Sequence, residues 1–131
     1  MKYEEFYSEL GKLLYAIADI DKRISPQEKE TLLKIVSSEL VPTVNHIDEF
    51  GTSVGYYPEF EFEYLDDDIA EVEPAFDSFI NFIEEHHTTI NKQMKDTAFR
   101  VTKELAGIYY GTNKKEKDLI LKLKKTLKKL K

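Results

Sequence analysis

The chain has 131 residues, enough to bury one core and too few for two, so residues 1–131 are expected to form a single domain. It contains no cysteine, which excludes disulfides, thiolate metal sites and thiol redox chemistry. The net charge of −6 is unevenly spread: residues 114–131 hold nine lysines and two acids, a local +7, so residues 1–113 carry −13.

Two amphipathic helices are predicted at the start of the chain. Apolar residues from Phe6 to Ile20 recur at spacings of three and four, which is the stripe of one buried helical face. Residues 25–28 then resemble a helix start, with a serine cap, a proline at the first helical position and a glutamate that can bond back. The second helix should be interrupted at Pro42. Its expected buried residues are Leu32, Ile35, Val36 and Leu40.

The structure of residues 49–68 stays open at this level. Two glycines and a proline oppose a long helix, and acids alternate with aromatics from residue 59 to residue 64, the period of an extended segment. Phe60 and Tyr64 are also one helical turn apart, so a helix is the alternative. An extended segment would turn Phe60, Phe62 and Tyr64 to one side and Glu59, Glu61 and Glu63 to the other.

Three more helices are predicted in the second half of the chain. One runs from Pro74 to about His87, and the next carries apolar residues from Ile90 to Ile108 on one side. The last covers residues 114–130 and should turn its apolar residues inward and its lysines outward. The expected fold is therefore an all-α bundle of about five to seven helices.

Residues 28–35 are echoed by residues 116–123, because both segments combine charged residues with the same run of leucine and isoleucine positions. The echo predicts two pseudo-repeated helix hairpins, one at each end of the chain. These hairpins should pack together, with the middle segment filling the gap between them.

The corner between the first two helices looks like part of a calcium loop, because Asp19 and Asp21 are two residues apart and Glu28 follows. An EF-hand needs an oxygen ligand at position five and glycine at position six. Counted from Asp19, these positions hold Arg23 and Ile24, so a true EF-hand is not expected. The three acids remain candidates for weak Ca²⁺ or Mg²⁺ binding, and a purely structural role for them is the favoured alternative.

The same corner resembles the repeated hairpin of the tellurite-resistance TerB-like family, which carries Ala-x-x-Asp-Gly-x-Ile-x-x-x-Glu before an apolar helix. The matching residues are Ala18, Asp21, Ile24 and Glu28, and Lys22 stands in place of the glycine. The resemblance implies an all-helical bundle with acidic patches that have been proposed as divalent-cation sites. It also implies a role in stress or metal-oxyanion resistance, as a protein-interaction module without established catalysis.

An acidic segment is the candidate partner-binding surface. Residues 35–91 contain fourteen Asp or Glu and no Lys or Arg, so a surface without a nearby basic residue and a basic protein partner are expected. A solvated lid over the core is the alternative. The candidate residues are Glu59, Glu61, Glu63, Asp66, Asp67 and Asp68.

Basic amphipathic helices such as the lysine-rich tail serve at anionic membranes and on nucleic acids. Here the bundle needs the apolar face of the tail, so neither partner is expected and the lysines should offset the acidic body. No glycine-rich phosphate loop or nucleophile elbow occurs, and we expect no enzymatic activity. The amino terminus lacks the features of a secretory signal and no apolar run reaches 18 residues, which predicts a cytoplasmic protein without a membrane span.

Overall fold

A computed structural model describes residues 3–19, 26–44, 46–68, 70–106 and 114–129 of the chain. Within them lie six α-helices of ten residues or more and a three-residue helical turn, α3 (Val41–Thr43). The longer helices are α1 (Tyr3–Asp19), α2 (Pro26–Ile35), α4 (Tyr57–Asp67), α5 (Val72–Glu85), α6 (Lys92–Ala106) and α7 (Lys114–Lys129). The β-structure of these residues is limited to one isolated bridge, between Ile47 and Ser53. The prediction of an all-α bundle is confirmed.

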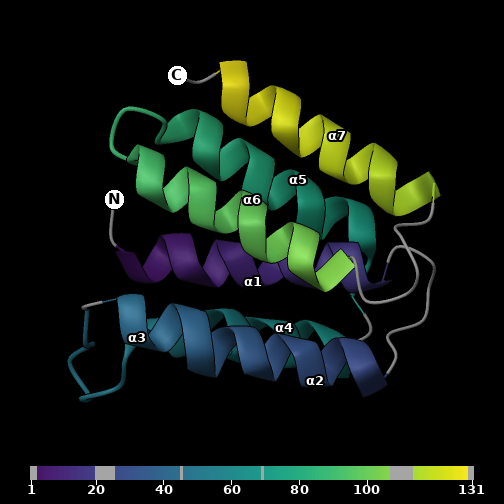
Figure 1. Cartoon of the computed structure of the whole chain (residues 1–131). Coiled ribbons are helices and arrows are strands. Elements are labelled where there is room, and N and C mark those ends of the chain that lie inside the picture. Colours follow the sequence, from purple (N-terminus) through teal and green to yellow (C-terminus); the bar gives the residue numbers. More distant parts are fainter. Residues whose placement is uncertain (1–2, 20–25, 45, 69, 107–113, 130–131) are drawn as a thin grey trace.

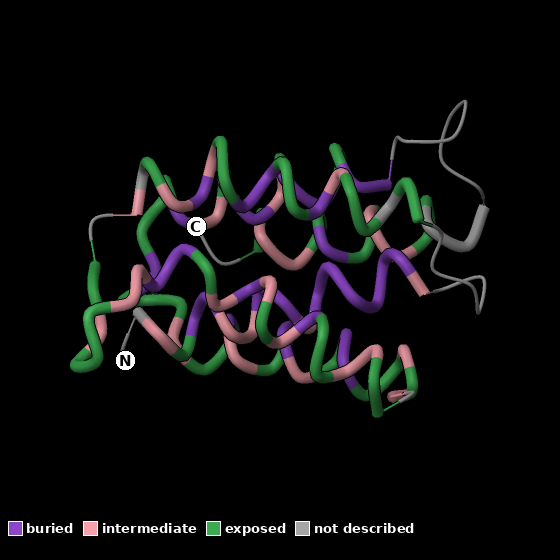
Figure 2. Tube along the Cα trace, turned by 90° about the horizontal axis from the view of Figure 1, so that it is seen from below, coloured by how far each residue is buried: buried purple, intermediate pink, exposed green. Residues whose placement is uncertain are grey.

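Helix α1 runs through the middle of the bundle (Figure 1). It packs chiefly against α4 and α5, and next against α6. Helices α2, α3 and α4 lie on one side of α1, α5 and α6 lie on the other, and α7 is outermost beyond them (Figure 1). Buried residues follow the faces that the helices turn toward one another (Figure 2).

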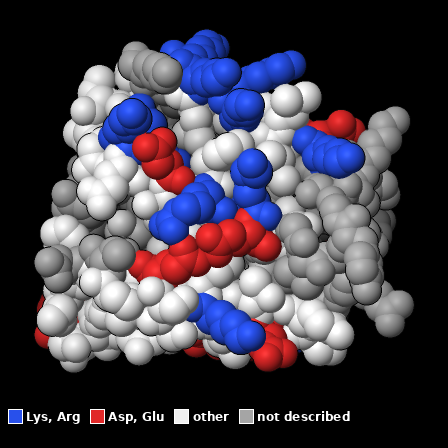
Figure 3. Space-filling model, viewed as in Figure 1, with Lys and Arg blue, Asp and Glu red and all other residues white. Residues whose placement is uncertain are grey.

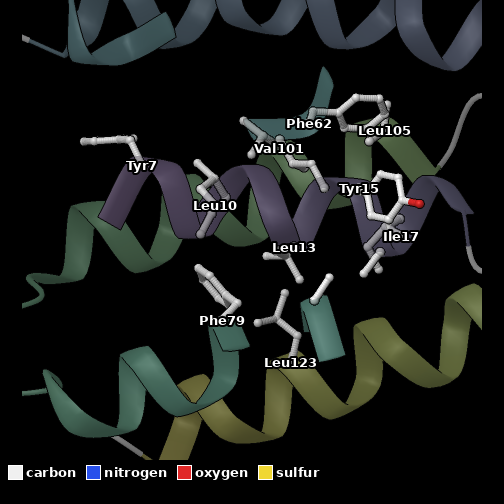
Figure 4. Close-up of a cluster of buried hydrophobic side chains, with 14 of the residues drawn as sticks. Tyr7, Leu10, Leu13, Tyr15, Ile17, Phe62, Phe79, Val101, Leu105 and Leu123 are labelled. Carbon is white, nitrogen blue, oxygen red and sulfur yellow. The ribbon is translucent and has the colours of Figure 1, made fainter. Parts of the chain in front are cut away.

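The core surrounds α1 because neighbours cover this helix on several sides. All six residues from Leu13 to Ala18 are buried, more than a single amphipathic stripe predicts. In Figure 4, Leu13 lies beside Phe79 of α5 and Leu123 of α7. On the α4 side, the rings of Tyr15 and Phe62 meet edge to face, with their centroids 5.8 Å apart. Aromatic pairs prefer this geometry, which therefore adds to the stabilisation from burial.

The helical run that begins with α2 passes through Pro42 instead of stopping there. Before the proline, residues Val36–Leu40 form a π-turn in which the Val41 amide donates to the Val36 carbonyl. A proline inside a helix lacks an amide hydrogen and crowds the carbonyl four residues earlier, and a widened turn relieves that crowding. The prediction that Pro42 interrupts the helix is corrected: the helical run ends at Thr43. The start at Pro26 and the burial of Leu32, Ile35, Val36 and Leu40 are confirmed.

A turn ordered by Asp48 joins α3 to α4. Its carboxylate accepts bonds from the Phe50 and Thr52 amides at 2.9 Å and from the Tyr57 hydroxyl at 2.6 Å. These bonds favour the ionised form, so they lower the pKa of Asp48 below its ordinary value. Gly51 has a φ of +83°, which a residue with a side chain rarely adopts.

The open question about residues 49–68 is decided for a helix in α4. Pro58 sits in the first turn of α4, where its missing amide hydrogen costs nothing. Phe62 is buried, whereas Phe60 and Tyr64 are exposed, so the three rings do not share one side. The extended alternative is wrong. Residues 57–67 form a helix, so residues two apart point to different sides instead of the same side.

The two ends of the chain meet in the core, since α1 and α2 both contact α6. The two expected hairpins pack differently. In the second, α6 packs on α7, as expected. In the first, α1 packs mainly on α4 and α5 rather than on α2. In α7, Leu123 is fully buried and Ile120 and Leu127 pack against the core at its edge. The middle segment is thus the principal partner of α1 and more than a gap filler. The predictions for Ile20, Ile108 and Leu130 lie outside the described residues.

Candidate functional site

Helix α4 is held against α1 by a crossing with almost no space between the backbones. A Cβ atom on Gly11 of α1 would lie 2.6 Å from the Pro58 carbonyl oxygen and 2.7 Å from Cβ of Glu61. Both distances are shorter than any real Cβ contact, so glycine is what permits this approach. The inner face of α4 therefore packs closely against α1, and its outer face is exposed to solvent.

The hydroxyl group of Tyr15 in α1 forms a hydrogen bond with the chain that follows α4. Tyr15 donates to the Ala70 carbonyl oxygen at 2.6 Å and lies 3.2 Å from the Asp19 carboxylate. Burial and the neighbouring Asp19 charge raise the pKa of Tyr15 to about 12, so its hydroxyl keeps its proton at neutral pH. Both ends of α4 are thus positioned, one by the Asp48 turn and the other by Tyr15.

A row of aromatic side chains follows the outer face of α4 and the turn just before it. Tyr56, Phe60 and Tyr64 follow one another at intervals of four residues and are 37%, 50% and 65% exposed. The rings of Tyr56 and Phe60 are nearly parallel, with centroids 6.2 Å apart. Single exposed apolar residues are ordinary, whereas several exposed rings along one side of a packed helix are typical of a contact surface. We call these three residues the aromatic row.

Beside the aromatic row, a groove of about 340 Å³ separates α2 from α4. Its apolar floor includes Leu32, Leu33 and Phe62, and Leu33 is exposed. Three carboxylates and one lysine line the rest of it. The complete lining is Lys29, Leu32, Leu33, Phe62, Glu63, Asp66 and Asp67, which we call the α2–α4 groove.

Lys29 is the basic residue of this groove. Its Nζ lies 2.9 Å from Oδ2 of Asp66, and this hydrogen bond and the carboxylate charge raise the pKa of Lys29. Glu63 and Asp67 make no ion pair with the residues that the structure describes. The groove therefore holds one carboxylate that is ion-paired and two that the Lys29 charge attracts without an ion pair among the described residues.

The six predicted partner-binding acids do not form one surface. Glu63, Asp66 and Asp67 meet in the groove, but Glu61 points toward α1, where burial raises its pKa. The remaining two lie apart from the groove lining. Glu59 is half-buried, with its pKa raised by burial and by the Glu63 charge, and Asp68 is exposed at the end of α4. A helix turns about 100° per residue, so alternate acids cannot stay on one side.

Two features of the surface were not predicted from the sequence. Lys29 enters from α2, so the expectation of a surface without a nearby basic residue is wrong. The aromatic row was missed because Tyr56 lay in a stretch with no assigned structure. The spacing of four among Tyr56, Phe60 and Tyr64 would predict one shared face, but only if these residues are helical.

The metal candidates remain only partly placed. Asp21 lies outside the described residues, and Glu28 belongs to α2 without a described side chain. Asp19 interacts with the Tyr15 hydroxyl. Within the part of the chain that the structure describes, no group of three or more His, Asp or Glu is arranged to hold a metal ion. Weak Ca²⁺ or Mg²⁺ binding at Asp19, Asp21 and Glu28 stays a prediction.

Comparison with known proteins finds no matching family model, no similar curated protein and no similar solved structure. The resemblance to the TerB-like family therefore rests on the motif residues alone. No helix among the described residues is both long and apolar enough to cross a membrane.

Proposed function

We propose that the protein is a non-enzymatic interaction module that binds a basic, partly apolar segment of a protein partner. The partner segment would cover the aromatic row and insert into the α2–α4 groove. The observation that carries this proposal is the exposed aromatic row along α4 and the turn before it, next to two groove carboxylates that make no ion pair with the described residues.

Each part of the surface has its own physical role. Aromatic side chains bury a large area with little loss of conformational freedom, and their faces attract lysine and arginine. Glu63 and Asp67 select basic side chains and speed the encounter at long range. Leu32 and Leu33 give an apolar residue of the partner a place to be buried. Basic and apolar residues one helical turn apart, as on an amphipathic helix, satisfy all three requirements.

We also propose, on the motif at residues 18–28, that this module is a cytoplasmic TerB-like domain acting in a stress or metal-oxyanion response. The cellular test is growth of source cells lacking the chain in the presence of tellurite. Restored growth from the intact chain, but not from a chain with an altered α4 surface, would support both parts together. Growth that is equal with and without the chain would contradict the assignment to this response.

The binding proposal is tested with a synthetic amphipathic peptide of lysine and leucine at helical spacing, measured by fluorescence anisotropy. Phe60→Ala with Tyr64→Ala should weaken binding at least tenfold, as loss of aromatic contacts at an interface centre costs roughly 2 kcal/mol or more. Glu63→Gln with Asp67→Asn should weaken binding most at low salt, because added salt screens the same charges.

The matched control removes two exposed acids from another helix. Glu73→Gln with Glu84→Gln changes the net charge equally but lies on α5, away from the groove. This variant should bind the peptide like the unaltered chain at moderate salt. Equal losses in the α4 and α5 charge variants would show that net charge alone attracts the peptide and would contradict a specific surface. Unchanged binding after removal of both aromatic rings would do the same.

A further inference from the structure

Helix α7 uses its apolar face to cover the bundle. Leu123 is fully buried there, and Ile120 and Leu127 are partly buried against the same core. The helix contacts α6 and lies on the side of the bundle farthest from α2 and α4 (Figure 1). Its opposite face is exposed to solvent from Lys117 to Lys129.

That outer face is basic, with one leucine at its centre. Leu121 is 52% exposed. Lys117, Lys124, Lys125 and Lys128 stand four residues before it and three, four and seven residues after it, which places all four around Leu121 on one helical face. All four lysines are exposed. Lysines gather along the α7 edge of the molecule in Figure 3.

Among the described residues, contacts with the acidic body involve the flank of α7 and not the four lysines around Leu121. Lys122, on the flank of the helix, lies 4.0 Å from Asp77 and over the ring of Phe76. The four lysines around Leu121 make no ion pair with the described residues. Asp118 is an exposed acid of the same helix and offsets only one of them. The face keeps a net positive charge.

We propose that the outer face of α7 binds the surface of an anionic lipid bilayer. The lysines would lie at the level of the lipid phosphates, and Leu121 would enter the boundary between headgroups and acyl chains. A bilayer fits better than nucleic acid because the described part of α7 carries no arginine for bidentate contacts and no aromatic ring for base stacking. An exposed leucine gains from lipid and gains nothing from a phosphate backbone.

The acidic surface of α4 lies too far from α7 to oppose this contact. Helices α5, α6 and α1 lie between α7 and the acidic α4 surface (Figure 1). Two helix layers of about 10 Å each exceed the screening length of about 8 Å at physiological ionic strength. The lysine face therefore meets the lipid charges with little opposition from α4. The aromatic row would point away from the bilayer and stay open to a partner.

The test is co-sedimentation of the full chain with phosphatidylcholine vesicles that contain or lack phosphatidylserine. Binding should require phosphatidylserine and should fall as salt is raised. Lys124→Gln with Lys125→Gln and Lys128→Gln should weaken binding on the order of 100-fold, since each lysine near an anionic surface contributes about a factor of five. All three positions are exposed, so the fold should be kept, which circular dichroism verifies.

The matched control removes the same charge from other helices. Lys34→Gln with Lys92→Gln and Lys103→Gln should leave vesicle binding within a few-fold of the unaltered chain, since these exposed lysines belong to α2 and α6. Equal losses in the two triple variants would overturn the proposal, as would absence of binding at low salt.

Leu121→Ser separates a bilayer from a nucleic acid. It should weaken vesicle binding several-fold, because the leucine side chain no longer enters the lipid boundary. Tighter binding to duplex DNA than to vesicles, with Leu121→Ser equal to the unaltered chain, would replace the lipid surface by a phosphate backbone.

Discussion

Helices α4 and α7 are both highly charged surface helices, but they are attached to the core in different ways. Helix α4 lies across Gly11 with its backbone nearly touching α1, and α2 approaches its flank across the groove. Helix α7 rests on the bundle through one apolar stripe centred on Leu123. A helix that contacts the core along one stripe has apolar residues at the helical period. A helix with neighbours on two sides has apolar residues on more than one face, so that period is harder to recognise in its sequence. The sequence therefore predicts α7 from its apolar spacing but leaves the structure of α4 undecided.

Removal of the buried ring of α4 should have the largest effect. Phe62→Ala deletes a fully buried side chain and its edge-to-face contact with Tyr15, and is expected to cost about 3–5 kcal/mol of unfolding free energy. Phe60→Ala, two residues earlier on the exposed face, should cost only about 1 kcal/mol, from the loss of its ring contact with Tyr56. Chemical denaturation of both variants checks the assignment of faces. Similar losses at the two positions would contradict it.

On α7, the corresponding change is Leu123→Ala. We expect a loss of about 2–4 kcal/mol, because the side chain is fully buried but its helix packs from the outside of the bundle. Ile120→Ala should cost less, since Ile120 is only half-buried. Thermal unfolding at matched concentrations gives the order of the two losses. The reverse order would mean that α7 is rotated from the described position.

The close crossing of α1 and α4 predicts an unusual effect for a glycine. Alanine is normally better than glycine inside a helix by about 1 kcal/mol. Gly11→Ala should nevertheless destabilise the fold by about 1–3 kcal/mol, because its methyl group would collide with the Pro58 carbonyl. Denaturant titration measures this, with Glu5→Ala on the exposed side of α1 as the control. A more stable Gly11→Ala chain would exclude the close crossing.

The smallest effect concerns the carboxylate that α4 turns toward α1. Burial raises the pKa of Glu61, so folding favours its protonated form. Its stabilising contribution is fully present below the ordinary pKa and is lost as pH rises through the raised value. Glu61→Gln should therefore be slightly more stable than the unaltered chain at neutral pH, by no more than roughly 0.5 kcal/mol, with the advantage fading in acid.

Unfolding measured from acid to neutral pH tests this sign, with the exposed Glu84→Gln as the comparison. A Glu61→Gln chain that is less stable at neutral pH would mean that the attraction between Glu61 and Lys12 outweighs the cost of burial.

Local spacing and capping are enough to specify the helices whose apolar residues meet the core along one stripe. The start at Pro26, the inward residues of α5 and α6, and Leu123 in α7 all follow from local spacing and capping chemistry. The charge separation between the acidic body and the basic tail is likewise a property of the sequence alone.

The middle of the chain takes its structure from long-range packing rather than from local spacing. The alternation of acids and aromatics from residue 59 to residue 64 is typical of a strand. In the fold, Gly11 lets α4 approach α1 closely and Tyr15 packs against Phe62, and both contacts require a helix with Phe62 inward. The groove likewise depends on Lys29 and Leu33, which are about thirty residues earlier in the chain. Local spacing carries no information about such distant neighbours, so the surface emerges only when α2 and α4 are packed side by side.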